Sequence, residues 1–92
     1  MNYELMTITK IDLGEEKAKE VSKNIQELIS SLNGKVTKTD FWGKRKLAYE
    51  VSHNTEGYYD LITFDLDSDK VSKLKSKLNL VQEVIRYLVT AL

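Results

Sequence analysis

The sequence predicts an α+β fold with four strands and two helices in the order βαββαβ, and the main evidence is periodicity. Apolar residues recur every three or four positions over residues 15–33 and again from Val71 to Leu78, which indicates two helices. Four other segments alternate or are rich in β-branched and aromatic residues, which is typical of strands. A chain of 92 residues has room for one such domain, which we assign to residues 1–92.

The first half of the chain predicts a strand followed by a long helix. Residues 2–10 alternate and are rich in Thr and Ile. Asp12 with Glu15 three positions later resembles a capping box and predicts the helix start. Asn33-Gly34 is expected to end the helix, because Gly tolerates the left-handed conformation. The apolar stripe of this predicted helix consists of Ala18, Val21, Ile25, Leu28, Ile29 and Leu32.

The middle of the chain predicts a β-hairpin. Residues 35–42 and 46–52 are strand-like, and Gly43 between them is expected to form a bulge or bend. Residues 52–57 form a polar turn cluster, and residues 58–66 are again rich in strand formers.

The last third predicts a helix and a final strand. Asp67, Ser68 and Asp69 are capping candidates for the helix that contains Val71 to Leu78, and residues 81–92 form the last strand. This order is the ferredoxin-like arrangement, which places both helices on one face of a four-stranded antiparallel sheet.

The second face of this sheet is expected to be open and partly apolar. A sheet with one solvated face normally alternates apolar and polar residues, but here both alternations carry apolar groups. If Ile62, Phe64 and Leu66 face the helices, the following side chains remain on the open face: Met6, Ile8, Tyr59, Leu61 and Leu88. Such a patch favours a protein-partner interface, although a small sheet with scattered surface hydrophobes is the alternative.

The composition argues against several classes of protein. The chain has no Cys and one His, which excludes disulfides, thiol catalysis and Cys-based metal sites. No run approaches the ~18 apolar residues of a membrane span. The N-terminal residues lack a basic start followed by an apolar run, so we expect a cytoplasmic protein without a membrane partner.

No group of residues indicates catalysis, a metal or a cofactor. His53 lies in the turn cluster without a Ser, Cys or carboxylate pair positioned to act with it. Asp65, Asp67 and Asp69 alternate at a strand–helix junction, where capping is a better explanation than a cation site. We therefore expect no enzyme activity.

The neutral total charge conceals two opposite segments. Residues 35–46 carry a net charge of +4, and residues 56–69 carry −5. Within the basic segment, Trp42 and Gly43 precede Lys44, Arg45 and Lys46. Cations neutralise phosphates and aromatic rings stack on bases, so this run favours an RNA contact. The alternative is an edge strand protected from aggregation by its lysines.

RNA binding through stacking on the sheet face, as in the RNA-recognition motif, fits poorly. Gly57 and Tyr58 agree with the third-strand signature of that motif. Glu56 replaces its cation, however, and Asp60 replaces a stacking aromatic residue.

The block from Trp42 to Tyr49 (W-G-K-R-K-L-A-Y), followed by Gly57-Tyr58-Tyr59, resembles the bacterial small-ribosomal-subunit protein S-six family. Tyr3-Glu4-Leu5 and Val84-Ile85-Arg86 are also similar to that family, so the resemblance extends from Tyr3 to Val89.

This resemblance implies a ferredoxin-like structural protein of the small subunit that binds ribosomal RNA together with ribosomal protein S-eighteen. The best matched cations are Arg45 and Arg86, with Lys44, Lys46 and Trp42 completing the expected RNA-binding set. The partner would cover the apolar sheet face, Leu47 and Tyr49 would be largely structural, and the free protein would be a monomer.

The chain departs from the family pattern at two places. Many relatives have Pro after the L-A-Y block where this chain has Glu50, and many have a tail beyond the position of Leu92. The sheet is therefore expected to make the partner contact. A competing hypothesis is a small-molecule-sensing or enzymatic ferredoxin-like module, because this fold serves many functions.

Overall fold

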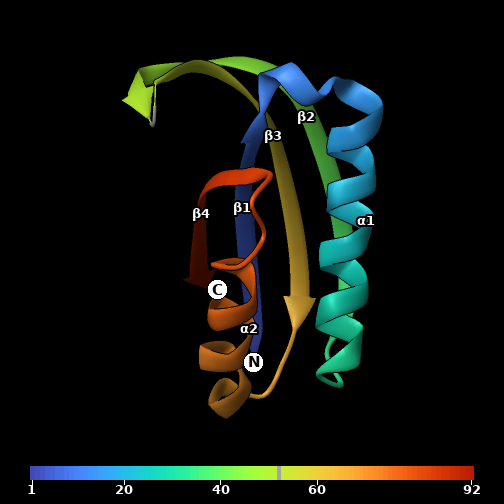
Figure 1. The fold of residues 1–92 in the computed structure, drawn as a ribbon. Coiled ribbons are helices and arrows are strands. Elements are labelled where there is room, and N and C mark those ends of the chain that lie inside the picture. The colour runs from blue at the N-terminus through green and yellow to red at the C-terminus, as the bar shows by residue number, and fades with distance from the viewer. Residues whose placement is uncertain (52) are drawn as a thin grey trace.

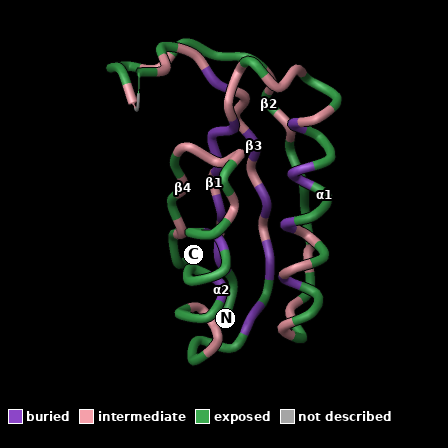
Figure 2. The backbone as a smooth tube through the Cα atoms, in the orientation of Figure 1, coloured by how far each residue is buried: buried purple, intermediate pink, exposed green. Residues whose placement is uncertain are grey.

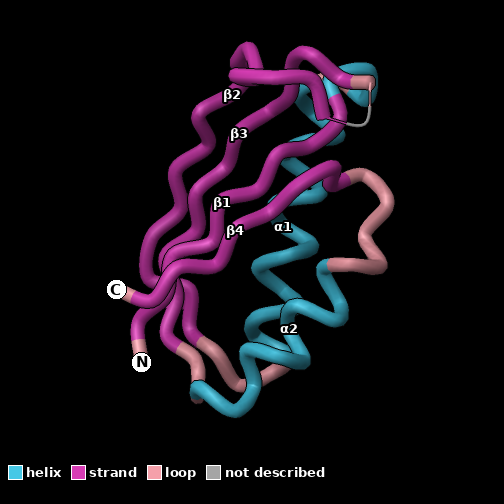
Figure 3. The backbone as a smooth tube through the Cα atoms, turned by 90° about the vertical axis from the view of Figure 1, so that its left-hand side faces the viewer, coloured by secondary structure: helices cyan, strands magenta, loops and turns pink. Residues whose placement is uncertain are grey.

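The computed structural model describes residues 1–51 and 53–92 and confirms the predicted βαββαβ order. The four strands form one antiparallel sheet in the spatial order β2-β3-β1-β4, and both helices lie on one of its faces (Figures 1 and 3). This is the ferredoxin-like fold. The strands are β1 (Asn2–Lys10), β2 (Lys35–Val51), β3 (Asn54–Asp65) and β4 (Val84–Ala91), and the helices are α1 (Glu15–Ser31) and α2 (Val71–Leu78).

The hydrophobic core lies between the sheet and the helices, and the central strands β1 and β3 supply much of it (Figure 2). Leu5 and Ile62 face each other across these strands and are fully buried. Tyr3 stacks on Phe64 with ring centroids 5.6 Å apart. Each fully buried aliphatic or aromatic side chain of this kind contributes about 1.5–3 kcal/mol to stability. The helices close the core with Val21, Ile25, Ile29, Leu74 and Leu78.

Helix α1 begins at Glu15 as predicted, but the predicted cap is wrong. A short 3₁₀ turn, Ile11–Leu13, precedes the helix and contains Asp12. The N-cap is instead Gly14, at a φ of 85°, and no side chain caps it. The Gly14 carbonyl accepts a hydrogen bond of 3.1 Å from the Ala18 N–H. The intervening turn thus places Asp12 too early in the chain to act as the cap.

Helix α1 ends close to the predicted Asn33-Gly34 pair, but Asn33 and not Gly34 is the left-handed residue. Asn33 has a φ of 65°, and the Gly34 N–H donates a 3.0 Å hydrogen bond to the Ile29 carbonyl. Gly34 is required there for close packing, because a Cβ atom on it would lie 2.7 Å from the Ile29 Cγ2. The helix ends at Ser31, two residues before the predicted boundary.

Strand β2 is continuous over 17 residues and has the predicted bulge at Gly43. Its register with β3 shifts between Phe41 and Gly43, and Gly43 has a φ of 83°. The hairpin of β2 and β3 extends beyond the rest of the sheet and bends toward the β4 side (Figure 1). The predicted turn over 52–57 is too long, because β3 already begins at Asn54; residue 52 of that turn lies outside the described residues.

The last third of the chain has shorter elements than predicted. Neither Asp67 nor Asp69 caps a helix through its side chain, and a 3₁₀ turn, Ser68–Lys70, leads into α2. The N–H groups of Leu80, Val81 and Val84 make turn hydrogen bonds after α2. Strand β4 therefore begins at Val84 instead of residue 81.

Candidate nucleic-acid and protein interface

All five residues predicted for the partner face lie on the side of the sheet away from the helices. Met6 on β1 is paired with Leu61 on β3 and with Leu88 on β4, and Ile8 is paired with Tyr59. Leu88 is 57% exposed, whereas Ile8 is only 4% exposed. Ile8 is covered partly by its neighbour Gly57, on which a Cβ atom would lie 2.4 Å from the Ile8 Cγ2. The exposed apolar face is thus centred on the other four residues.

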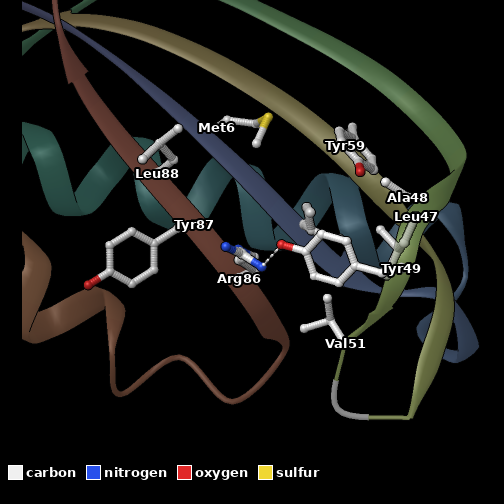
Figure 4. Close-up of a pocket in the computed structure, with 10 residues that line it drawn as sticks. Met6, Leu47, Ala48, Tyr49, Val51, Tyr59, Arg86, Tyr87 and Leu88 are labelled. Atoms are coloured by element: carbon white, nitrogen blue, oxygen red, sulfur yellow. Dashed lines mark hydrogen bonds between the residues drawn. The ribbon is translucent and has the colours of Figure 1, made fainter.

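The bent end of the hairpin turns this face into a hollow. Residues 47–50 of β2 lie in an irregularity between the paired residues Lys46 and Val51, and Tyr49 extends from this segment toward β4 (Figure 4). The hollow has a volume of about 280 Å³. Its lining combines the sheet residues Met6, Ile8, Tyr59, Arg86, Tyr87 and Leu88 with the hairpin residues Leu47, Ala48, Tyr49 and Val51. We call this surface the open-face hollow.

Arg86 lies in the open-face hollow and contacts the hairpin end. Its Nη1 donates a 2.6 Å hydrogen bond to the Tyr49 hydroxyl. Its guanidinium carbon also lies 5.6 Å from the centroid of the Tyr49 ring, within the range of a cation–π contact. Tyr49 is 62% exposed, so this pair is accessible to a partner.

Trp42 is held at the bulge of β2 by a stacking and a hydrogen-bonding contact. Its ring lies nearly parallel to that of Tyr59, at 9° with centroids 6.4 Å apart. Its Nε1 donates a 3.0 Å hydrogen bond to the Asp40 carboxylate. The side chain is still 44% exposed. An ordered indole with free surface is suited to stack on an unpaired base.

The basic run of β2 is divided between the two faces of the hairpin. Gly43 and Arg45 pair with Tyr59 and Gly57, so Arg45 lies on the open-face side and Lys44 and Lys46 on the other. The Lys44 Nζ lies 3.8 Å from a Glu56 carboxylate oxygen, and the Arg45 Nη1 donates to the Lys44 carbonyl at 2.9 Å.

The structure does not bring Arg86 next to the basic run. One row of paired residues crosses the sheet from Gly43 through Tyr59 and Ile8 to Arg86. Three strand spacings separate its ends, which is about 14 Å. The two predicted cations on the open face, Arg45 and Arg86, therefore lie toward opposite edges of it, with the apolar residues between them.

Tyr49 and its neighbours are the part of this surface that sequence reasoning missed. Leu47 and Tyr49 were expected to be largely structural, but both line the open-face hollow. A signal was present in the sequence, because Leu47, Tyr49 and Val51 alternate as large apolar residues through a segment in which residues 47–50 have no register partner on β3. Exposed apolar residues in an irregular part of an edge strand indicate an interaction surface.

None of the described helices is long and apolar enough to span a membrane. Among residues 1–51 and 53–92, no cluster of three or more His, Asp or Glu side chains is placed to hold a metal ion.

The sequence matches the family model described as ribosomal protein S6 over residues 2–91. It is 41% identical over 85 residues to small ribosomal subunit protein bS6 of Citrifermentans bemidjiense, which covers 92% of this chain and 63% of that protein. It is 38% identical over 87 residues to the bS6 protein of Fusobacterium nucleatum, covering 95% and 93% of the two chains. The chain thus spans less than two thirds of the first relative and nearly all of the second.

A solved structure gives the same result. The crystal structure of 30S ribosomal protein S6 from Thermotoga maritima superposes with a TM-score of 0.90 at 29% identity, covering 96% of this chain and 83% of that one. The relatives are named as ribosomal proteins and not as enzymes, in agreement with the expectation that this chain is not an enzyme. The family match over residues 2–91 places this chain in the ribosomal protein S6 family of the small ribosomal subunit.

Proposed function

We propose that this protein is a structural component of the small ribosomal subunit that binds ribosomal RNA together with ribosomal protein S-eighteen. The observation that carries the proposal is an open sheet face in which an apolar hollow lies between cations at two edges. Membership of the ribosomal protein S6 family supplies the ribosomal context. The partner and the RNA sites are carried over from the resemblance of the Trp42–Tyr49 block.

The RNA contact is assigned to Trp42, Lys44, Arg45, Lys46 and Arg86. Of these, Arg45, Lys46 and Arg86 have no carboxylate within 4.0 Å among the described residues, so their charges are available to phosphates. Trp42 supplies an exposed ring beside them. The combination of cations and an aromatic ring is typical of proteins that bind single-stranded or looped RNA.

The protein partner is assigned to Met6, Ile8, Tyr59, Leu61 and Leu88. Leu88 and the hairpin residue Tyr49 stand on opposite sides of the open-face hollow (Figure 4). A partner side chain in this hollow would bury apolar surface on the sheet and on the hairpin at once. Burial of apolar surface contributes roughly 25 cal/mol per Å².

The neutral total charge favours an order of assembly. Fourteen basic and fourteen acidic residues leave no net attraction for a polyanion. The assigned RNA contact contains only the cations Lys44, Arg45, Lys46 and Arg86, so we expect a modest electrostatic contribution to RNA binding. We therefore expect the complex with S-eighteen to form first and to bind RNA more tightly than either protein alone.

Incorporation into reconstituted small subunits tests the assignment. The double variant Arg45→Ala, Arg86→Ala removes one cation from each edge of the open face and should incorporate poorly at low protein concentration. The matched control is Lys73→Ala, Lys77→Ala, which removes two exposed charges of α2 on the far side of the molecule. Normal incorporation of the arginine variant would overturn the assigned RNA sites, and absence of the wild-type protein from the particles would overturn the function.

A further inference from the structure

A second hollow lies on the helix side of the sheet, between α1 and strands β2 and β3. Its volume is about 200 Å³. It shares no lining residue with the open-face hollow and takes no part in the proposed ribosomal contacts. The lining residues are Lys19, Ser22 and Gln26 from α1, Thr39 and Phe41 from β2, and Asp60 from β3.

Asp60 is the unusual member of this hollow, because it is a buried carboxylate without a partner. The residue is 3% exposed, and neither carboxylate oxygen has a hydrogen-bond partner among the described residues. Buried carboxylates are normally paired or hydrogen-bonded, since removing their charge from water is costly. Asp60 therefore calls for a proton, an ordered water or a cation in the hollow that it lines.

The electrostatic surroundings of Asp60 agree with this requirement. Burial raises the pKa of the Asp60 carboxyl, the nearby Ser22 hydroxyl and Leu61 N–H offset part of that rise, and the charge of Asp40 adds to it. Its paired neighbours are Thr7 on β1 and Phe41 on β2, neither of which carries a charge.

The hollow already attracts one cation. The Lys19 Nζ lies 5.6 Å from the centroid of the Phe41 ring. Phe41 is held in place by stacking on Tyr58, with centroids 6.2 Å apart. The faces of aromatic rings attract ammonium groups. A fixed ring together with an unpaired carboxylate is a suitable environment for a second ammonium group.

We propose that this hollow is a binding site for a small organic cation of the alkylammonium class. The ammonium N–H groups would donate to the Asp60 carboxylate, and the alkyl part would lie against Phe41. The volume of about 200 Å³ exceeds the ~30 Å³ share of a water molecule several times, so a group the size of methylammonium fits. Lys19 is the cation of the protein itself that such a ligand would have to displace from the Phe41 ring.

Titration of the protein with methylammonium chloride, followed by NMR against sodium chloride at equal ionic strength, tests the site. We expect saturable shifts of the backbone amides of Ser22, Gln26 and Asp60. Asp60→Asn should weaken binding at least tenfold, because it removes the charge and keeps the shape. The control Asp67→Asn removes an exposed acid outside the hollow and should leave binding unchanged.

The substitution Lys19→Met is expected to change the affinity for methylammonium in the opposite direction. It removes the competing cation from the mouth of the hollow and should tighten binding several-fold. Lys19 is exposed, so this variant is also expected to fold. Unchanged affinity in Lys19→Met, unchanged affinity in a folded Asp60→Asn, or no saturable shift in the wild type would overturn the proposal.

The pH dependence and a second probe sharpen the test. The charged groups near Asp60 are Lys19 on α1 and Asp40 on β2, while β1 contributes only the neutral Thr7. Binding needs the carboxylate, so it should strengthen as pH rises through the carboxyl pKa; binding that is equal at all pH values would contradict the site. Binding of methylammonium alone would point to a free amine as ligand, and additional binding of Nα-acetyl-lysine amide would point to a lysine side chain of a neighbouring protein.

Discussion

The guanidinium of Arg86 on β4 donates a 2.6 Å hydrogen bond to the hydroxyl of Tyr49, which lies 37 residues earlier at the end of β2. The contact joins the bent end of the hairpin to the far edge of the sheet and forms one wall of the open-face hollow (Figure 4). Both side chains are exposed, so the cation–π contribution is about 0.5–1 kcal/mol. The pair therefore positions the hairpin end more than it stabilises the fold.

Substitution of Tyr49 tests this positioning role. Tyr49→Phe removes the hydrogen bond and keeps the ring, whereas Tyr49→Ala removes both. We expect the free energy of unfolding to change by less than about 1 kcal/mol in each variant. Amide hydrogen exchange over residues 47–51 should rise slightly in Tyr49→Phe and more in Tyr49→Ala. Exchange in Tyr49→Ala equal to that of the wild type would contradict the role.

Trp42 is expected to contribute to RNA affinity by stacking on a base. Trp42→Ala should weaken binding of the complex with S-eighteen to small-subunit RNA by about 1–3 kcal/mol, and Trp42→Phe by less, because Phe retains an aromatic face. Filter binding at fixed salt measures both, and unfolding curves of the free variants control for lost stacking on Tyr59. Equal RNA affinities of Trp42→Ala and the wild type would exclude the contact.

The salt dependence of RNA binding reports whether Arg45 contacts a phosphate. Each phosphate contact contributes about 0.7–0.9 to the slope of log K against log salt concentration. Arg45→Ala should reduce that slope by this amount, and the control Lys73→Ala on α2 should leave it unchanged. If both variants give the wild-type slope, Arg45 is a solvated edge residue.

Asp60 should make the stability of the protein depend on pH. Its pKa is raised in the folded state, so the folded protein binds the proton more tightly than the unfolded chain. Stability is therefore expected to fall as pH rises from the ordinary Asp pKa of 3.8 through the raised pKa. At pH 7, Asp60→Asn should be more stable than the wild type by about 1–3 kcal/mol, and the difference should vanish below the ordinary pKa. Urea unfolding at several pH values measures this, and a wild-type stability that increases over that range would contradict the sign.

The sequence was sufficient for the fold because its strongest signals are local. The apolar stripe from Ala18 to Leu32 fixes the helical period. Five residues of this stripe belong to the hydrophobic core or pack against it: Val21, Ile25, Leu28, Ile29 and Leu32. The predicted helix caps were wrong because a short 3₁₀ turn precedes each helix and moves the acidic residues away from the capping positions. A turn of three residues is too short to produce a periodic pattern in the sequence.

The candidate site was only partly predictable. The alternation along β1, β3 and β4 assigned Met6, Leu61 and Leu88 to the correct face. The course of β2 was not predictable, because each register shift reverses which alternate residues face the helices. The contact of Tyr49 with Arg86 depends on the bend of the hairpin end, and the burial of Asp60 depends on how α1 covers the sheet. Both are tertiary effects that alternation alone does not encode.

The central claim is that RNA and a protein partner bind jointly through the open face of the sheet. The most direct measurement is the affinity of this chain for its small-subunit RNA site with and without S-eighteen, for the wild type and for Leu88→Glu. We predict that S-eighteen tightens binding of the wild type at least tenfold, and that Leu88→Glu, folded and with its cations intact, loses this gain. Equal affinity of the isolated wild type and the mixture, or full enhancement in Leu88→Glu, would contradict the account.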